Sequence, residues 1–155
     1  MIETRLKRYG LRIRPGADFE IVNPEDDPRY RDYVELLLQR AGRRGVSPEA
    51  ARAMVRNDNT VIAALAVQRG DADAMLCGLQ GRYEKHLRNV DIIIGRRFGV
   101  RDLSALSILI SQRGVTFLTD THVTVDPTAE ELAEMTILAA EQIRRFGIEP
   151  RAAFL

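Results

Sequence analysis

The chain has 155 residues, of which 45% are hydrophobic and 29% charged, and its formal net charge is +1. These values are typical of one soluble globular domain, and a nearly neutral chain gives no electrostatic reason to expect binding to nucleic acid or to an anionic membrane. No apolar run approaches the ~18 residues that a membrane-spanning helix needs, and the first residues lack the apolar core of a secretory signal. The single cysteine, Cys77, excludes an internal disulfide and indicates a reducing, cytoplasmic location.

Apolar residues at helical spacing, bounded by capping residues or glycines, predict several helices along the chain. These helices are expected at Ile2–Tyr9, Arg29–Arg40, Pro48–Asn57, Thr60–Arg69 and Arg82–Ile94. Short apolar or β-branched runs that end at glycine, proline or polar turns predict strands. These strands are expected at Phe19–Val22, Ala74–Cys77, Leu106–Ser111, Val115–Thr119 and Ala152–Leu155. The tight turn between the third and fourth of them predicts a hairpin or a bent pair.

One helix near the C-terminal end carries signals for both of its ends. Thr128 is a capping residue and Glu131 follows three positions later, which is the pattern of a capping box. Arg144 and Arg145 lie in the last turn, where positive charge complements the helix dipole. Gly147 follows as a residue that can take the left-handed conformation at a helix end. The sequence therefore predicts a helix that begins after Thr128 and ends just before Gly147.

The alternation of apolar strands with helices predicts an α/β fold with three layers, α/β/α, around a mostly parallel sheet. The chain begins directly on a helix signal and ends inside a strand signal. We therefore expect one domain over residues 1–155, excised from a longer multidomain chain. Such a segment exposes strand edges or apolar faces, so we also expect it to form at least a homodimer.

A glycine turn followed by a polar helix is the first candidate site. The pair Gly78-x-x-Gly81 lies between the predicted strand at Ala74–Cys77 and the next helix, where backbone N–H groups can face an anion. The start of that helix carries Arg82, Tyr83, Lys85, His86 and Arg88. Arginine can bind phosphate through two hydrogen bonds, which favours an anion-binding face. A plain turn between strand and helix, followed by a solvated helix face, explains the same residues.

A second candidate site follows the predicted strand at Val115–Thr119. Asp120, Thr121 and His122 lie just past its carboxyl end, where open α/β sheets bind their ligands. Asp120 can equally serve as a buried cap for neighbouring backbone groups. His122 does not complete a catalytic triad, because the nucleophile motif G-x-S-x-G is absent from the sequence.

Other reactive or charged residues predict no chemistry. Cys77 lies in an apolar run, so we expect an inert thiol in the core. Two histidines and one cysteine, widely spaced, predict no metal site. A basic cluster without interleaved aromatic residues indicates a solvated surface or a subunit contact rather than a nucleic-acid site. Its members are Arg40, Arg43, Arg44, Arg52 and Arg56.

Four stretches of the chain resemble the phosphate acetyltransferase/butyryltransferase family. They are Ile21–Arg29, Gly70–Met75, Val125–Glu134 and Phe146–Ala153. In order and spacing the match runs from about Asp18 to Leu155. The resemblance implies a phosphotransacetylase-like fold.

The sequence departs from the active transferases after the predicted strand at Ala74–Cys77. There the family carries a Ser-Gly-Ala stretch, hydroxyl residues and an Asp-Thr-Val-Arg-Pro-Ala-Leu run, of which only Gly78 and Arg88 match here. The pattern of Tyr83, His86, Leu87 and Arg88 is instead similar to the C-terminal domain of bacterial NADP-dependent malic enzymes. In that family the phosphotransacetylase-like tail is thought to bind acetyl-CoA and to regulate the malic enzyme without transferring acetyl groups.

This resemblance implies a set of partners and contacts. Acetyl-CoA is the expected effector and no catalytic residue is expected in this chain, while NADP and a divalent metal (Mg or Mn) belong to the malic enzyme part. The expected partners are a second copy of the chain and the malic enzyme domain of the same polypeptide. The residues expected to contact the effector are Gly78, Tyr83, His86, Arg88, Asp120 and Thr121. Two alternatives stay open: a fragment of an active phosphate acetyltransferase, in which Arg88 holds phosphate or CoA, and a purely structural dimerisation module.

Overall fold

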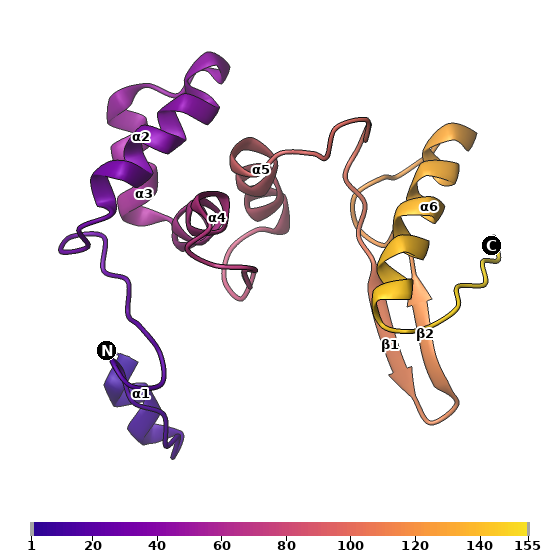
Figure 1. The fold of residues 1–155 in the computed structure, drawn as a ribbon, viewed down its shortest axis with the longest axis horizontal. Helices are drawn as coiled ribbons and strands as arrows, with labels where there is room; N and C mark the ends of the chain where they lie inside the picture. Colours follow the sequence, from indigo (N-terminus) through magenta and orange to yellow (C-terminus); the bar gives the residue numbers. More distant parts are fainter. Residues whose placement is uncertain (1, 155) are drawn as a thin grey trace. The chain divides into compact units, whose positions relative to one another are not determined.

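The structure is a computed structural model that describes residues 2–154. Its contacts divide the chain into two compact units, Met1–Gly95 and Arg96–Leu155 (Figure 1). The first unit is helical and the second combines a β-hairpin with one long helix. Within the described residues, no helix is both long enough and apolar enough to cross a membrane.

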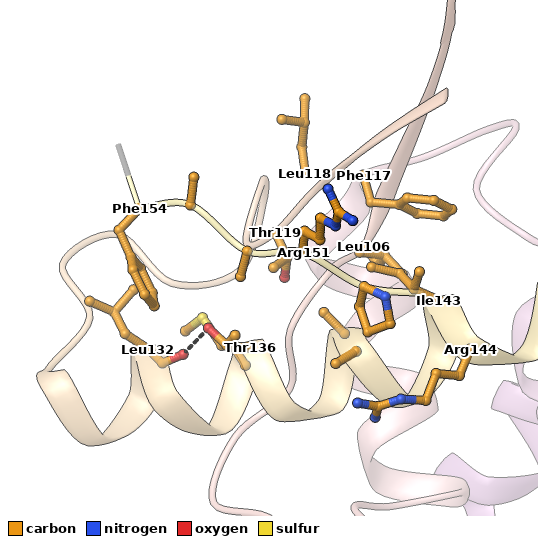
Figure 2. A pocket seen from close by; sticks show the side chains of 16 residues that line it. Leu106, Phe117, Leu118, Thr119, Leu132, Thr136, Ile143, Arg144, Arg151 and Phe154 are labelled. Atoms are coloured by element: carbon orange, nitrogen blue, oxygen red, sulfur yellow. Dashed lines mark hydrogen bonds between the residues drawn. The ribbon is translucent and has the colours of Figure 1, made fainter. Parts of the chain in front are cut away.

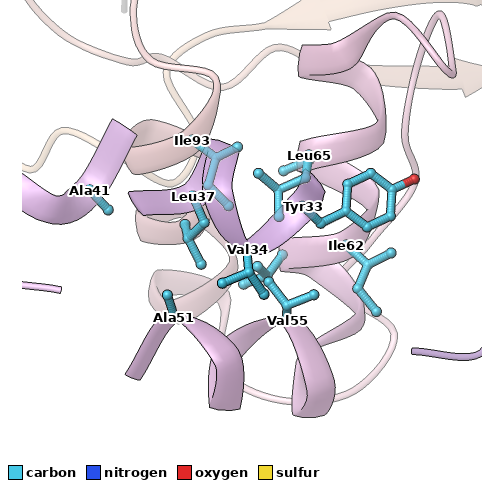
Figure 3. Packing of buried hydrophobic residues seen from close by; sticks show 11 residues of the cluster. Tyr33, Val34, Leu37, Ala41, Ala51, Val55, Ile62, Leu65 and Ile93 are labelled. Carbon is cyan, nitrogen blue, oxygen red and sulfur yellow. The ribbon is translucent and has the colours of Figure 1, made fainter. Parts of the chain in front are cut away.

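Four helices of the first unit pack around one apolar core. The helices of this unit are α1 (Ile2–Arg8), α2 (Tyr30–Ala41), the 3₁₀ turn η1 (Gly42–Arg44), α3 (Pro48–Asn57), α4 (Asn59–Arg69) and α5 (Tyr83–Ile93). Leu37, Leu65 and Ile93 are fully buried in the core, on α2, α4 and α5, and Figure 3 shows them beside Val55 of α3. Helix α1 buries none of its side chains. The core of α2 to α5 is therefore what holds the first unit together.

Local signals set the ends of the core helices. Ser47 accepts a hydrogen bond from the N–H of Ala50 at 3.2 Å, and Pro48 follows at the first position of α3. Asp58 caps α4 by accepting from the N–H of Thr60 at 3.0 Å. Gly70 ends α4 with φ +83°, a left-handed conformation that glycine adopts without a steric penalty. These caps place the N-terminus of α4 beside the turn that leads into α5.

The second unit is a two-stranded antiparallel hairpin followed by a long helix. Strand β1 (Ser107–Ser111) pairs with β2 (Gly114–Leu118), with Ile108 opposite Phe117. Helix α6 spans Ala129–Arg145. Both halves of the predicted capping box are present, because Glu131 donates its N–H to Thr128 Oγ1 at 3.3 Å and accepts from the N–H of Thr128 at 2.7 Å. The hairpin and α6 were thus correctly predicted from sequence.

Three of the predicted strands are not formed. Among residues 2–154 the only sheet is the β1–β2 hairpin, so the strand assignments at Phe19–Val22, Ala74–Cys77 and the described part of Ala152–Leu155 are wrong. Phe19 makes only an isolated bridge to Pro15. An extended segment becomes a strand through a ladder of hydrogen bonds to a neighbouring strand, and these segments pair with no strand among the described residues. Several of their apolar side chains are exposed, as at Ile21 and Leu76, while Met75 packs against the core of the first unit.

Candidate functional site

A cavity of about 400 Å³ lies at the N-terminal end of α4. It is lined by residues 57–60, by the glycine turn 76–81, and by Lys85 and His86 of α5. Two residues of the first unit, Gly78 and His86, were predicted from the sequence to contact a ligand. Both of them therefore lie at one cavity. Cys77 also lines this cavity and is exposed, so the expectation of a buried core thiol is wrong. The predicted strand that would have buried Cys77 is not formed.

His86 uses both of its ring nitrogens within the wall of this cavity. Its Nε2 lies 2.8 Å from the carbonyl oxygen of Gln80, and its Nδ1 lies 2.7 Å from Thr60 Oγ1. A carbonyl oxygen can only accept, so Nε2 carries a proton and donates it. In the neutral ring, Nδ1 then accepts from the Thr60 hydroxyl. His86 thus joins the glycine turn to the start of α4.

Asp58 forms the charged floor of the cavity. Its Oδ2 accepts from Lys85 Nζ at 2.8 Å and from Asn89 Nδ2 at 3.1 Å, while Oδ1 caps α4. Burial alone would raise the pKa of Asp58, but the hydrogen bond and charge of Lys85, with backbone N–H donors, lower it below its usual value. The carboxylate is therefore ionised at neutral pH and neutralises the one lysine that lines the cavity.

The glycine turn depends on its two glycines. Gly78 and Gly81 have φ of +98° and +105°, which side-chain-bearing residues rarely adopt. A Cβ on Gly81 would lie 3.2 Å from His86 Nε2, which is closer than about nine in ten Cβ contacts in proteins. Gly81 is therefore needed both for its backbone conformation and for the approach of His86.

Tyr83 and Arg88 lie on α5 outside the lining of this cavity. Tyr83 is the first residue of the helix and is 46% exposed, and Arg88 is exposed in the middle of the helix. The described residues that line the cavity do not include either side chain. The structure thus separates the predicted contacts of the first unit into a cavity pair, Gly78 and His86, and a pair on the helix surface.

Asp120 and Thr121 belong to the second unit and organise the loop after β2. Asp120 Oδ1 accepts from the N–H groups of Ala105 at 2.9 Å and His122 at 3.2 Å. Its Oδ2 accepts from Val123 at 3.1 Å and Thr124 at 2.7 Å. Burial alone would raise the pKa of Asp120, but these four backbone donors lower it below its usual value.

The geometry around Asp120 favours the cap that the sequence left open over a catalytic base. A carboxylate that already accepts four hydrogen bonds and holds a lowered pKa is a weak proton acceptor. Thr121 also joins the loop to the hairpin, because its Oγ1 lies 2.8 Å from Ser107 Oγ. The two predicted contacts of this unit therefore hold the backbone in shape.

A second cavity, of about 370 Å³, lies within the second unit between β2, α6 and the segment 150–154. Figure 2 shows its largely apolar wall, with Leu106, Phe117 and Ile143 at one end and Leu132 and Phe154 at the other. The Thr136 hydroxyl, which also lines it, donates to the carbonyl of Leu132 at 2.7 Å. The cavity therefore combines a largely apolar wall with the side chains of two threonines, Thr119 and Thr136, and two arginines, Arg144 and Arg151.

Several site residues were not predicted from the sequence. The sequence predicts a helix that begins at Thr60 and gives neither Thr60 nor Asp58, just before it, a role at a cavity. The pattern Asp58-x-Thr60 does match a capping signal, so the cap could have been found locally. The link to His86 joins residues 26 positions apart, which no local pattern reveals. The cavity in the second unit likewise depends on tertiary packing.

Comparison with known proteins assigns the chain to a family. The family described as Phosphate acetyl/butaryl transferase matches residues 1–155, so the chain belongs to it. The EutD phosphotransacetylase from Staphylococcus aureus has a similar structure, with a TM-score of 0.81 and 20% identity over 96% of this chain and 44% of that one. This likeness confirms the predicted α/β phosphotransacetylase-like fold. The sheet among residues 2–154, however, is a two-stranded antiparallel pair and not the mostly parallel sheet that was predicted.

Within this family, the most similar of the relatives compared are malic enzymes. The chain is 65% identical over its whole length to an NAD-dependent malic enzyme of Rhizobium meliloti (strain 1021) and 49% identical to an NADP-dependent malic enzyme of Escherichia coli (strain K12). A phosphate acetyltransferase of Nitratidesulfovibrio vulgaris is 34% identical over 88% of the chain. The chain spans about a fifth of the length of these relatives, namely 20%, 20% and 19%. It is therefore similar to the phosphotransacetylase-like part of malic enzymes, as the sequence motifs predicted.

Proposed function

We propose that this chain is the acetyl-CoA-binding regulatory and oligomerisation domain of a malic enzyme, and that it transfers no acetyl group itself. One observation carries the proposal: four malic enzymes are 46–65% identical over the whole chain. Two phosphate acetyltransferases, at 27–34%, and two further malic enzymes, at 30–33%, are less similar. The malic enzyme part of such a protein would oxidise and decarboxylate malate with a nicotinamide cofactor and a divalent metal. The relatives include both NAD-dependent and NADP-dependent enzymes. We therefore assign the choice between NAD and NADP to the malic enzyme part of the protein.

The geometry supports binding without turnover. A phosphotransacetylase needs a base for the CoA thiol and cationic donors for the phosphate and acyl oxygens. Both ring nitrogens of His86 are engaged, and the Asp120 carboxylate accepts four backbone hydrogen bonds. Lys85 is paired with Asp58. Groups that are held in this way can shape a binding surface, but they are poorly placed to move protons.

In the proposed complex, Arg88 supplies the principal contact to the phosphates of acetyl-CoA. It is exposed on α5, three positions after Lys85 and two after His86, which line the cavity. Its guanidinium can form paired hydrogen bonds with phosphate oxygens. Tyr83, at the start of the same helix, offers an exposed aromatic face for the adenine ring. The glycine turn at Gly78 would approach the ligand with its backbone.

The proposed oligomer rests on the exposed hairpin. Ile108, Leu109 and Ile110 of β1 are 44%, 54% and 79% exposed, which is unusual for adjacent large apolar side chains on a strand. A second copy of the chain would cover them. Sedimentation of the full-length protein as a monomer at high micromolar concentration would contradict this part of the proposal.

The substitution Arg88→Ala in the full-length malic enzyme tests the effector site. Loss of a charged hydrogen-bonding partner should raise the acetyl-CoA concentration for half-maximal inhibition roughly tenfold to a hundredfold. Malate oxidation is measured against acetyl-CoA concentration, with each rate divided by the rate without effector. Arg31→Ala, which removes the same charge from an exposed position on α2, is the matched control. An inhibition curve for Arg88→Ala that matches the control would show that Arg88 does not contact the effector.

A further inference from the structure

We propose that His86 and Thr60 form a clamp that holds the glycine turn 76–81 in the conformation competent for the effector. In this role His86 is a positioning residue and does not itself contact the ligand. The inference rests on the proposed function for the identity of the ligand, acetyl-CoA. The clamp itself rests only on the geometry of the cavity.

The clamp joins a buried support to an exposed turn. In the support, Thr60 is only 4% exposed and belongs to the first turn of α4, which Asp58 caps. Asp58 is held in turn by Lys85 and Asn89 of α5, and Asn89 is 6% exposed. His86, one turn away from Asn89 on the same helix, therefore projects from a buried and cross-linked support.

On the other side, the glycine turn has little packing of its own. Leu76 and Leu79 are fully exposed, so their side chains contribute no burial that would hold the turn. Two of its residues, Gly78 and Gly81, have left-handed backbone conformations. Segments with few buried apolar contacts open locally at low cost. The hydrogen bond from His86 Nε2 to the carbonyl of Gln80 is therefore a main restraint on the shape of the turn.

The hydroxyl of Thr60 sets the direction in which the imidazole donates. Because Nδ1 accepts from this hydroxyl in the neutral ring, the proton stays on Nε2, which faces the Gln80 carbonyl. Without the hydroxyl, the ring can take the other tautomer or rotate, and the Gln80 carbonyl loses its donor. The clamp thus depends on one oxygen atom of a buried threonine.

Two substitutions act on the clamp from opposite sides. Thr60→Val keeps the shape of the side chain and removes the hydroxyl. Gly81→Ala places a methyl group where a Cβ meets His86 Nε2 at 3.2 Å, so it pushes the ring away from the turn. The second variant lies in an exposed turn, so it acts even if the first variant fails to fold. Gly78→Ala, which strains the same turn at φ +98° without meeting His86, is its control in the alkylation readout.

The test uses the full-length protein and two readouts. The first is the rate at which iodoacetamide alkylates Cys77, measured by mass spectrometry of the peptide that contains it, because Cys77 is exposed within the turn and lines the cavity. The second is the dissociation constant of acetyl-CoA by calorimetry. Thr60→Val and Gly81→Ala should change the alkylation rate of Cys77 several-fold and weaken acetyl-CoA roughly tenfold. Thr60→Ser should restore both values.

The control and the contrary results separate the clamp from the proposed function. Thr4→Val, on the exposed helix α1, removes a hydroxyl from the same unit and should match the wild type in both readouts. Wild-type values for Thr60→Val and Gly81→Ala would overturn the clamp, as would a failure of Thr60→Ser to rescue. If the wild type binds no acetyl-CoA, the proposed function fails, and the alkylation readout still decides whether the clamp exists.

Discussion

Replacing Asp120 by asparagine should loosen the loop that follows β2. The carboxylate of Asp120 accepts hydrogen bonds from four backbone N–H groups, those of Ala105, His122, Val123 and Thr124. An asparagine keeps one acceptor oxygen and turns an NH₂ group toward the donors that the other oxygen served. Two of the four donors then lose their partner.

The size of the effect follows from those lost bonds. A buried donor without a partner costs about 1–3 kcal/mol, and Asp120 is only half-buried, so water recovers part of the loss. We therefore expect Asp120→Asn to cost about 2 kcal/mol and Asp120→Ala, which removes all four acceptor interactions, about 4 kcal/mol. At 1.4 kcal/mol per factor of ten, these values correspond to opening of the loop about 30-fold and nearly 1000-fold more often.

Hydrogen exchange in the full-length protein measures this opening directly. Peptides that cover residues 104–124 should exchange faster in both variants, while peptides from α2 to α5 should exchange as in the wild type. Asp126→Asn, which removes the same charge from the same loop, is the control. Unchanged protection of residues 104–124 in Asp120→Ala would refute the reasoning, because the carboxylate would then not hold the loop.

The effect of Asp120→Asn on the protection of this loop should depend on pH in a defined direction. The pKa of Asp120 is lowered in the folded protein, so its carboxylate stabilises the loop fully above the unfolded pKa, about 3.9 for aspartate. This contribution is lost as the pH falls through the lower, folded pKa. The difference in protection between wild type and Asp120→Asn should therefore be constant near neutral pH and shrink only below about pH 4.

Two further predictions concern the supports of the fold. Leu37→Ala, at a fully buried position on α2, should destabilise the first unit by about 2–5 kcal/mol. Denaturant titrations of the full-length protein measure this loss, and a value below about 1 kcal/mol would show that the core is loosely packed. Thr128→Ala removes the capping box of α6 and should cost about 1 kcal/mol, seen as faster exchange of the amides at the start of that helix, whereas Thr128→Ser should keep most of the protection.

Helices and the hairpin could be predicted because their signals are local. The ends of α6 depend on Thr128, Glu131 and the turn before Gly147, all of which lie within the helix or next to it. The hairpin depends on two β-branched runs and the turn that joins them. Each of these elements obtains its hydrogen bonds from its own neighbourhood, so a short stretch of sequence contains the necessary information.

The strand at Ala74–Cys77 and the burial of Cys77 could not be judged in the same way. An apolar run predicts a strand, but a strand also needs a neighbouring chain segment to pair with, and sequence pattern does not identify one. In this structure the segment has no such partner among residues 2–154, and Leu76 and Cys77 are exposed. The residue types at the cavity were visible, as with His86, but its partners Thr60 and Gln80 emerged only from the packing of α4 against α5.

The central claim is that this domain binds acetyl-CoA and does not turn it over. The most direct measurement is equilibrium binding of acetyl-labelled acetyl-CoA to the full-length protein in phosphate buffer, followed by chemical identification of the bound and free label. We predict saturable binding in which the label remains acetyl-CoA. Label recovered as acetyl phosphate would identify an active transferase, and the absence of saturable binding would leave only a structural role; either result would contradict the account.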